Sequence, residues 1–280
     1  MRENKVVYGL IGYGGMGRWH TEILSNVSEA VIGGIYDIKK EKREEAKEKG
    51  FFVYETEEAM LADPDIDVVL IATPNDCHKP IAIRAMHAGK NVISEKPVTL
   101  SSADLLEMEH AAKETGKLLT VHQNRRWDDD FLIIKKLVEE QKLGHVFRIE
   151  SRVHGSRGIP GDWRKEKVHG GGMVLDWGVH LLDQILYMYG DRKIETVYAS
   201  LTNVTNQEVD DGFTAILTFE GGTEVLVEVG TNNYISLPRW YVLGEDGTAV
   251  IRDWQLNGEI IRKTGRTEAV SYTHLTLPTT

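Results

Sequence analysis

The first half of the chain alternates short runs of aliphatic and β-branched residues with longer stretches of helical periodicity. The short runs predict strands at 6–11, 30–36, 68–72, 91–94 and 118–122. The stretches between them predict helices near 15–27, 39–49, 57–61, 79–88 and 101–115. Strands and helices in alternation build a parallel sheet with helices on both faces. Residues 1–126 are therefore predicted to form a doubly wound α/β domain.

The pattern changes beyond about Trp127. One amphipathic helix at 131–142 precedes a strand at 146–153, and a glycine-rich stretch precedes a helix over 173–189. After that helix the pattern predicts only strands, at 194–201, 213–219, 223–231, 240–243 and 248–252. Turn residues at 221–222 and 246–247 are typical of antiparallel hairpins. Residues 127–270 are therefore predicted to form an α+β domain with a mostly antiparallel, open sheet.

The last ten residues, 271–280, contain no charged side chain and follow neither a helical nor a strand pattern. We expect them to be a non-native tail, and we leave them out of the fold prediction.

Composition narrows the class of protein. Lys plus Arg (33) against Asp plus Glu (43) leaves a net charge of −10, which argues against nucleic-acid and anionic-membrane partners. Ignoring glycine, no apolar run exceeds five residues, whereas a transmembrane helix needs about 20. Cys77 is the only cysteine, so neither an intrachain disulfide nor a thiolate zinc site is expected. These features predict a cytoplasmic protein.

A glycine-rich sequence follows the first predicted strand and opens the first predicted helix. It matches G-x-G-x-x-G and reads Gly12-Tyr13-Gly14-Gly15-Met16-Gly17. Gly12 permits a tight turn, Gly14 lets the backbone approach a pyrophosphate, and Gly17 brings helix and strand together. Asp37 follows Gly17 by 20 residues, at the end of the second predicted strand, where it can accept from ribose hydroxyls. Dinucleotide binding is therefore predicted, although a ligand-free glycine turn is the alternative.

Asp37 also bears on the choice of cofactor. A 2′-phosphate beside this carboxylate would cost about 4 kcal/mol per pair of like charges at 4 Å and an effective dielectric of 20. Lys39 and Lys40 could offset part of that repulsion. We expect NAD to be preferred, with NADP as an acceptable second cofactor.

Two short motifs supply candidate catalytic groups. Lys96, in Glu95-Lys96-Pro97, follows the strand at 91–94, at the carboxyl end where open α/β sheets bind ligands. Asp176 and His180 lie four residues apart in the helix predicted over 173–189, so both can face one pocket, and Asp183 is within reach of His180. A carboxylate that orients an imidazole suits a general base. Surface positions are the alternative for both motifs, and no metal is expected at Asp176 and His180 because a third ligand is not evident.

Together these motifs resemble the Gfo/Idh/MocA oxidoreductase family, which includes inositol dehydrogenases. The resemblance spans about residues 5–255 and rests on five segments in order: the Gly12 fingerprint, 72–75 with His78, 95–97, 124–126 and 176–180. It implies an N-terminal Rossmann domain and a C-terminal domain whose open sheet usually mediates dimers or tetramers. Family members are usually longer, so we expect this chain to lack part of that sheet.

The resemblance also implies roles for individual residues. Lys96 would orient the reacting hydroxyl and the nicotinamide, with Pro97 frequently cis. His180 would take the hydroxyl proton, and Asp176 would contact the substrate or orient the base. Arg125 would face the substrate, and Trp163 and Arg164 would lie near the pocket mouth. The residues implied to line the cofactor, besides the glycine loop and Asp37, are Thr73, Pro74, Asn75, His78, Glu95 and Lys96.

The predicted function is hydride transfer between a secondary alcohol of a sugar or cyclitol and a nicotinamide cofactor, with His180 as general base. Phosphorylated sugars stay open as substrates because Arg157, Arg164 and Lys165 cluster in one segment. Two alternatives belong to other classes: a redox-neutral, NAD-dependent glycoside hydrolase and a non-catalytic NAD-binding sensor.

Overall fold

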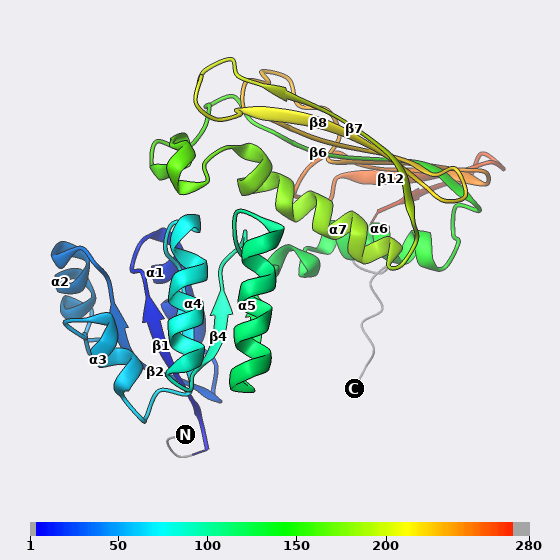
Figure 1. Cartoon of the computed structure of the whole chain (residues 1–280). Coiled ribbons are helices and arrows are strands. Elements are labelled where there is room, and N and C mark those ends of the chain that lie inside the picture. The colour runs from blue at the N-terminus through cyan, green and yellow to red at the C-terminus, as the bar shows by residue number, and fades with distance from the viewer. Residues whose placement is uncertain (1–3, 271–280) are drawn as a thin grey trace. The chain divides into compact units, whose positions relative to one another are not determined.

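The structure, a computed structural model, describes residues 4–270 (Figure 1). The chain divides into two compact units, Met1–His122 and Gln123–Thr280. Each unit has its own sheet and its own apolar core. We call them the N-terminal unit and the C-terminal unit and describe each by itself.

The N-terminal unit contains a five-stranded parallel sheet in the order β2-β1-β3-β4-β5. Its strands are β1 (Val6–Ile11), β2 (Ala30–Tyr36), β3 (Val68–Ile71), β4 (Asn91–Ser94) and β5 (Leu119–Val121). Its helices are α1 (Gly15–Leu24), α2 (Lys40–Glu48), α3 (Glu57–Ala62), α4 (His78–His87) and α5 (Ser102–Thr115), with a 3-10 turn at Asn75–Cys77.

Helices cover both faces of this sheet because side chains alternate along each strand. In β1, Val7 and Ile11 belong to one buried cluster, and Leu10 belongs to another. In β3, Val69 joins the first cluster and Leu70 the second. The predicted doubly wound α/β fold is therefore confirmed. Since β1 pairs with both β2 and β3, the strand order reverses there, and α/β proteins bind ligands outside the carboxyl ends of strands at such a point.

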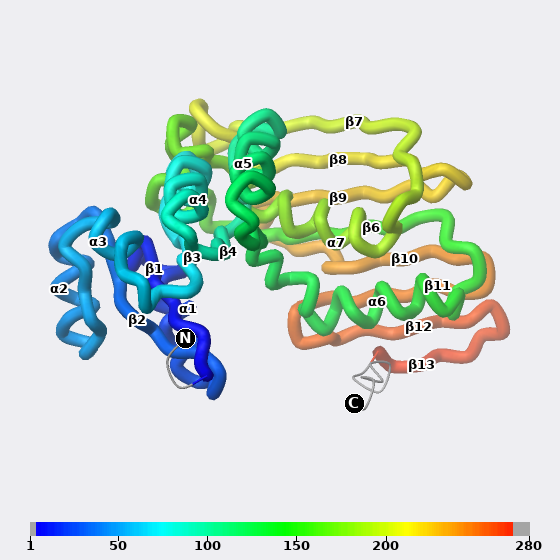
Figure 2. Tube along the Cα trace, turned by 60° about the horizontal axis from the view of Figure 1, so that its bottom comes forward, coloured from blue at the N-terminus to red at the C-terminus, as the bar shows by residue number. Residues whose placement is uncertain are grey.

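The C-terminal unit contains an eight-stranded sheet in the order β13-β12-β11-β10-β6-β9-β8-β7 (Figure 2). Its strands are β6 (Val146–His154), β7 (Ile194–Thr202), β8 (Gly212–Phe219), β9 (Glu224–Gly230), β10 (Trp240–Gly244), β11 (Gly247–Ile251), β12 (Gly258–Arg262) and β13 (Thr267–Ala269). Every neighbouring pair is antiparallel except β6 and β9. The prediction of a mostly antiparallel sheet is therefore confirmed.

Two helices, α6 (Asp129–Glu139) and α7 (Val179–Tyr189), cover one face of this sheet (Figure 1). Phe131 on α6 and Leu181 on α7 share a buried cluster with Phe213 on β8 and Val227 on β9. Shorter helical segments lie at Asn124–Trp127, Trp163–Lys165, Lys167–His169 and Val174–Gly178. Among residues 4–270, no helix is both long and apolar enough to cross a lipid bilayer.

The sequence-based prediction differs from the structure in two places. The helix expected over 173–189 begins with a π-helical segment at Val174–Gly178, and regular α-helix starts only at Val179. Strands β12 and β13 were not predicted, because 258–269 is mostly charged and polar and Ile260 is its one fully buried side chain. The expectation of a non-native tail at 271–280 lies outside the described residues.

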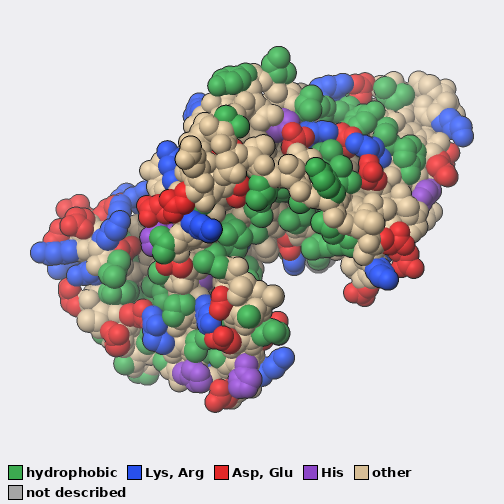
Figure 3. Space-filling view, turned by 45° about the horizontal axis from the view of Figure 1, so that its top comes forward, with side chains coloured by type: hydrophobic (Ala, Val, Ile, Leu, Met, Phe, Trp, Pro, Cys, Tyr) green, Lys and Arg blue, Asp and Glu red, His purple; other side chains and the backbone are tan. Residues whose placement is uncertain are grey.

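The face of the C-terminal sheet opposite α6 and α7 carries alternating charges. Glu228 on β9 contacts Arg152 (Oε2–Nε 3.1 Å) and His154 (Oε1–Nε2 3.2 Å) on β6. Figure 3 shows acidic and basic side chains beside one another among apolar ones on this unit. Six charged or titratable side chains on β6 and β9 pair with one another on this face, and we call them the outer-face ladder. They are Arg148, Glu150, Arg152, His154, Glu224 and Glu228.

Glu228 loses its proton more readily within the outer-face ladder than an ordinary glutamate does. Hydrogen bonding from His154 is the largest cause, burial opposes it, and Arg152 adds a further favourable contact, so the pKa of Glu228 lies below its ordinary value. A carboxyl with a lowered folded-state pKa stabilises the fold above its unfolded pKa of about 4.3 and loses this contribution as the pH falls towards the folded value.

We therefore predict that Glu228→Gln lowers the free energy of unfolding at pH 7 by about 2 kcal/mol, because charge-assisted hydrogen bonds are lost. The variant should also lose less stability than the parent chain between pH 7 and pH 3, because the parent loses the contribution of Glu228 below about pH 4.3. Urea unfolding at both pH values measures the two effects. Glu220→Gln, at an exposed turn, is the control. Equal pH dependence in the parent and Glu228→Gln chains would contradict the role of Glu228.

Candidate active site

The glycine loop between β1 and α1 is held by close backbone contacts. Gly12 has φ +97°, and a Cβ there would lie 2.5 Å from the carbonyl oxygen of Ala72. A Cβ on Gly17 would lie 2.1 Å from the carbonyl oxygen of Gly12. By contrast, a Cβ on Gly14 or Gly15 would meet no atom within 4 Å. The two end glycines are therefore required by packing, while open space at the central ones suits the approach of a phosphate to the N-terminus of α1.

Asp37 directly follows β2 and accepts a hydrogen bond from the glycine loop. Its Oδ2 accepts from the backbone N–H of Tyr13 at 2.7 Å, and its Oδ1 accepts from that of Lys39 at 2.8 Å. A carboxylate has about four acceptor positions, so these two bonds leave capacity for ribose hydroxyls. The structure thus gives Asp37 a structural role that the motif alone did not predict.

The loop after β3 meets the turn that follows β4. His78 is fully buried, with Nδ1 at 2.8 Å from the carbonyl oxygen of Pro97 and Nε2 at 3.0 Å from that of Thr73. Burial is the main cause that lowers the pKa of His78, although both backbone contacts oppose it. A neutral imidazole has one N–H, so it donates to one of these carbonyls at a time. The Lys96–Pro97 peptide bond is cis, as the resemblance implies.

Glu95 lies at the carboxyl end of β4 and is only 5% exposed. Its Oε1 is 2.6 Å from Nε2 of His20 on α1 and 3.1 Å from Nδ1 of His122, directly after β5. Its Oε2 accepts from the backbone N–H of Lys96 at 3.2 Å. Burial opposes ionisation, but the hydrogen bonds from the two histidines outweigh it, and the pKa of Glu95 lies far below its usual range. Neither histidine was predicted to belong to the site.

In the C-terminal unit, the segment before α7 is anchored by a partly buried carboxylate. Asp210 accepts at Oδ2 from the backbone N–H groups of Met173 and Val174, both at 2.9 Å. Gly172 has φ +102°, and a Cβ there would lie 2.3 Å from Oδ1 of Asp210. Burial is the main cause that raises the pKa of Asp210. This anchor fixes where the π-helical segment begins, and the sequence contained no motif for it.

Asp176 and His180 lie on either side of the junction between the π-helical segment and α7. Asp176 lies in the π-helical segment, whose turns are wider than those of the α-helix predicted over 173–189. Asp176 Oδ1 is 3.3 Å from Nε of Arg164. His180 is 5% exposed and lies edge-on to Trp177, with 6.0 Å between ring centroids.

Arg125 stacks on the same tryptophan from the 3-10 turn that precedes α6. Its guanidinium carbon lies 4.1 Å from the centroid of Trp177, 5.3 Å from that of Trp254, and its Nη1 is 2.8 Å from Oδ2 of Asp128. Arg125 and His180, both predicted site residues, therefore share Trp177 as a neighbour. Trp254, which is 47% exposed, was not predicted.

Asp183 and Trp163, two further residues from the sequence analysis, each have an arginine neighbour. Asp183, expected within reach of His180, is held by Arg126 through two hydrogen bonds of 2.6 and 2.8 Å. Trp163 contacts Arg164, whose guanidinium carbon lies 4.5 Å from the ring centroid.

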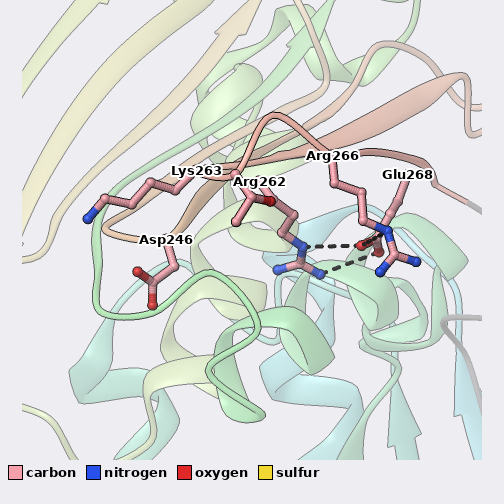
Figure 4. A pocket seen from close by; sticks show the side chains of 6 residues that line it. Asp246, Arg262, Lys263, Arg266 and Glu268 are labelled. Atoms are coloured by element: carbon pink, nitrogen blue, oxygen red, sulfur yellow. Dashed lines mark hydrogen bonds and ion pairs between the residues drawn. The ribbon is translucent and has the colours of Figure 1, made fainter.

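Two hollows in the C-terminal unit lie apart from these residues. One, beside the β12–β13 turn, is lined mainly by charged side chains that pair with one another, such as Arg262 with Glu268 (Nε–Oε1 3.4 Å; Figure 4). The other has a volume of 330 Å³, and its lining includes Arg157 and Lys165. Neither contains a residue predicted to bind cofactor or perform catalysis.

Comparison with known proteins identifies the family. Residues 6–123 match the "Oxidoreductase family, NAD-binding Rossmann fold", and residues 131–250 match the "GFO/IDH/MocA C-terminal domain". The chain belongs to the Gfo/Idh/MocA oxidoreductase family. The resemblance inferred from the motifs is thereby confirmed.

Three relatives of this Gfo/Idh/MocA chain give a measure of the similarity. A solved NAD-binding protein from Listeria innocua superimposes with a TM-score of 0.91 at 54% identity, covering 92% of this chain and 74% of that one. The scyllo-inositol 2-dehydrogenase (NADP(+)) of Bacillus subtilis is 31% identical over 86% of this chain and 67% of its own length. The myo-inositol 2-dehydrogenase of Thermotoga maritima is 30% identical over 76% of this chain and 65% of its own length.

The glycine contacts in this family member yield a direct prediction. Gly17→Ala should destabilise the chain by about 1–3 kcal/mol, the usual cost of overpacking, because the new methyl group would collide with the Gly12 carbonyl. Thermal unfolding without cofactor measures this cost. Gly15→Ala, with open space around the added methyl group, is the matched control and should unfold like the parent chain. If both variants unfold alike, the close approach of Gly12 and Gly17 is not what constrains this loop.

Proposed function

We propose that the protein is an NAD(P)-dependent dehydrogenase that transfers a hydride between a secondary alcohol of a sugar or cyclitol and the nicotinamide. The observation that carries this proposal is that one chain combines the glycine loop and Asp37 with a buried histidine beside Trp177, on which Arg125 stacks. The two inositol dehydrogenases among its relatives support the substrate class. The alignments span 45–67% of the length of the curated relatives, so the activity of the whole protein is part of the proposal.

In this proposal the N-terminal unit holds the cofactor. Backbone N–H groups at the start of α1 bind the pyrophosphate, and Asp37 accepts from the adenosine ribose. The bound nicotinamide supplies the hydride acceptor or donor. Further contacts come from Gly12, Gly14, Gly15, Met16, Gly17, Thr73, Pro74, Asn75, His78, Glu95 and Lys96, as the family motifs imply.

The acid–base chemistry is assigned to three side chains. His180 removes the proton from the substrate hydroxyl, and Asp176 contacts the substrate or orients that imidazole. Lys96 stabilises the negative charge that develops on the substrate oxygen. His78 and Glu95 act as positioning residues, because they contact the carbonyl of Pro97 and the N–H of Lys96.

The substrate side is assigned to the C-terminal unit. Arg125 and Trp163 join Asp176 and His180 as substrate-binding residues. A polyol presents many hydroxyl groups, and guanidinium and carboxylate groups bind these through hydrogen bonds. The nearby ring of Trp177 offers an apolar surface for the carbon-bound hydrogens of a sugar ring.

Cellular location and assembly are further parts of the proposal. We place the protein in the cytoplasm, consistent with its single cysteine. We also propose a homodimer or homotetramer formed through the C-terminal sheet. On β7, Val197, Tyr198 and Leu201 are between 56% and 64% exposed, more apolar surface than a lone edge strand usually presents.

The proposal predicts the outcome of an activity panel. Inositols, aldoses and sugar phosphates are offered with NAD or NADP, and absorbance of the reduced cofactor is followed at about 340 nm, a wavelength specific to reduced nicotinamide. We expect sustained reduction with a free polyol and a higher kcat/KM with NAD, because Asp37 disfavours a 2′-phosphate. Release of an aglycone without net reduction would instead indicate a redox-neutral hydrolase. Equal kcat/KM for both cofactors would refute the predicted preference.

A second prediction tests the base. His180→Ala should lower kcat by about 10²–10⁴-fold, the usual contribution of a general base, and leave NADH affinity nearly unchanged. Steady-state kinetics and NADH fluorescence titration measure the two quantities. His145→Ala, which removes an exposed histidine of the same unit, is the control. Near-parental kcat in His180→Ala would show that another group takes the proton.

A further inference from the structure

We propose that the N-terminal unit contains a binding site for one zinc ion, ligated by His20, Glu95 and His122. The three candidate ligand atoms are Nε2 of His20, Oε1 of Glu95 and Nδ1 of His122, and all lie within 4.8 Å of one another. Within residues 4–270 no other set of three His, Cys, Asp or Glu side chains converges in this way. No short sequence spacing links these residues, so the sequence does not predict the site.

The donor set suits zinc. Two imidazole nitrogens and one carboxylate oxygen are a combination that proteins use for Zn²⁺, with a water molecule in the fourth position. Ligand bonds of about 2.0–2.2 Å place ligand atoms somewhat more than 3 Å apart. The contact between His122 and Glu95 is 3.1 Å, and that between His20 and Glu95 is 2.6 Å. Small rotations of His20 and Glu95 would therefore bring the three atoms to zinc-binding distances.

Both imidazoles already direct a nitrogen at the same carboxylate oxygen. Both nitrogens point at Oε1, so a cation shared by the three atoms would lie beside this oxygen after the small rotations described above. Zinc binding requires each facing nitrogen to give up its hydrogen, either to the other nitrogen of the ring or to solvent. The ion would thus replace the two hydrogen bonds, and no charged group needs to leave the site.

The surroundings match those of a protein metal site. Glu95 and His20 are 5% and 4% exposed, so the carboxylate lies away from bulk water. Its attraction for a cation is stronger there than in water. The side chain of His122 is 25% exposed and offers a route for the ion. Trp19 packs against both rings, at 5.1 Å from His20 and 5.6 Å from His122 between centroids, and forms an apolar wall.

The ion would link three elements that are distant in sequence. His20 belongs to α1, Glu95 follows β4, and His122 follows β5. Because the ligands come from separate elements, binding to the folded state alone would stabilise the N-terminal unit. The site shares Glu95 with the proposed cofactor contacts, but its ligands include neither Asp176 nor His180, so binding of the ion can be tested without dehydrogenase activity.

Metal titration of the full chain tests this proposal. Metal-free protein is titrated with Co²⁺ while the visible d–d absorption is followed, and Zn²⁺ is then added as competitor. We expect one Co²⁺ per chain with the intense bands of four-coordinate cobalt, displaced by one Zn²⁺. Thermal unfolding should shift upward with Zn²⁺. Absence of saturable binding of one ion per chain would overturn the proposal.

Variants locate the ion. His122→Gln, at the most exposed ligand, should weaken Zn²⁺ binding by at least about 10-fold, and the similarly shaped Glu95→Gln should do the same. His110→Gln is the matched control, because His110 is 80% exposed and faces Glu114 on the helix surface. Circular dichroism confirms that each variant is folded. Equal affinity in His122→Gln and His110→Gln would place the ion elsewhere, and NADH titration of the His122→Gln sample reports separately on the cofactor loop.

Discussion

The carbonyl oxygen of Gly12 lies so close to Gly17 that no side chain fits between them. This contact sets where α1 begins relative to the end of β1, because the helix can approach the Gly12 carbonyl this closely only where residue 17 lacks a Cβ. The position of α1 in turn determines where His20 lies, and His20 contacts Glu95 at 2.6 Å. Glu95 then accepts from the backbone N–H of Lys96. The close contact of Gly12 with Gly17 thus affects the position of Lys96, through α1, His20 and Glu95.

The C-terminal unit depends on a different constraint, the two-sidedness of its sheet. One face packs against α6 and α7 through buried apolar residues such as Phe213 and Val227, and the other carries the outer-face ladder. The apolar face of the sheet therefore holds α7 in place. Asp210 holds the segment before α7 by accepting hydrogen bonds from two backbone N–H groups. Because His180 is the second residue of α7, both constraints contribute to its position.

Local patterns predicted the fold class and the order of most elements. Alternation of strands and helices identified the parallel sheet, since its buried strands, such as β3, are short and almost wholly aliphatic. Strands β12 and β13 escaped prediction because hydrogen bonding to a neighbouring strand, and not apolar content, defines them. The π-helical segment escaped for a similar reason: it depends on the contact of Asp210 with Met173, 37 residues away.

The candidate site was predicted only where its residues belong to a contiguous motif. The glycine loop, Glu95-Lys96-Pro97 and the pair Asp176 and His180 are visible in the sequence. His20 and Glu95 are separated by 75 residues, so only the paired strands and packed helices of the fold bring them together. Trp254 likewise reaches Arg125 from a segment that carried no recognisable pattern.

Three arginines of the C-terminal unit are paired with carboxylates. Arg126 is matched by Asp183 at 2.6 Å, and Arg164 by Asp162 at 2.7 Å. Arg125 is matched by Asp128 in the same way, at 2.8 Å. A phosphate group needs cations whose charge is not already neutralised. These carboxylates already pair with the guanidinium groups, so any anionic ligand would have to compete with them for Arg125, Arg126 and Arg164.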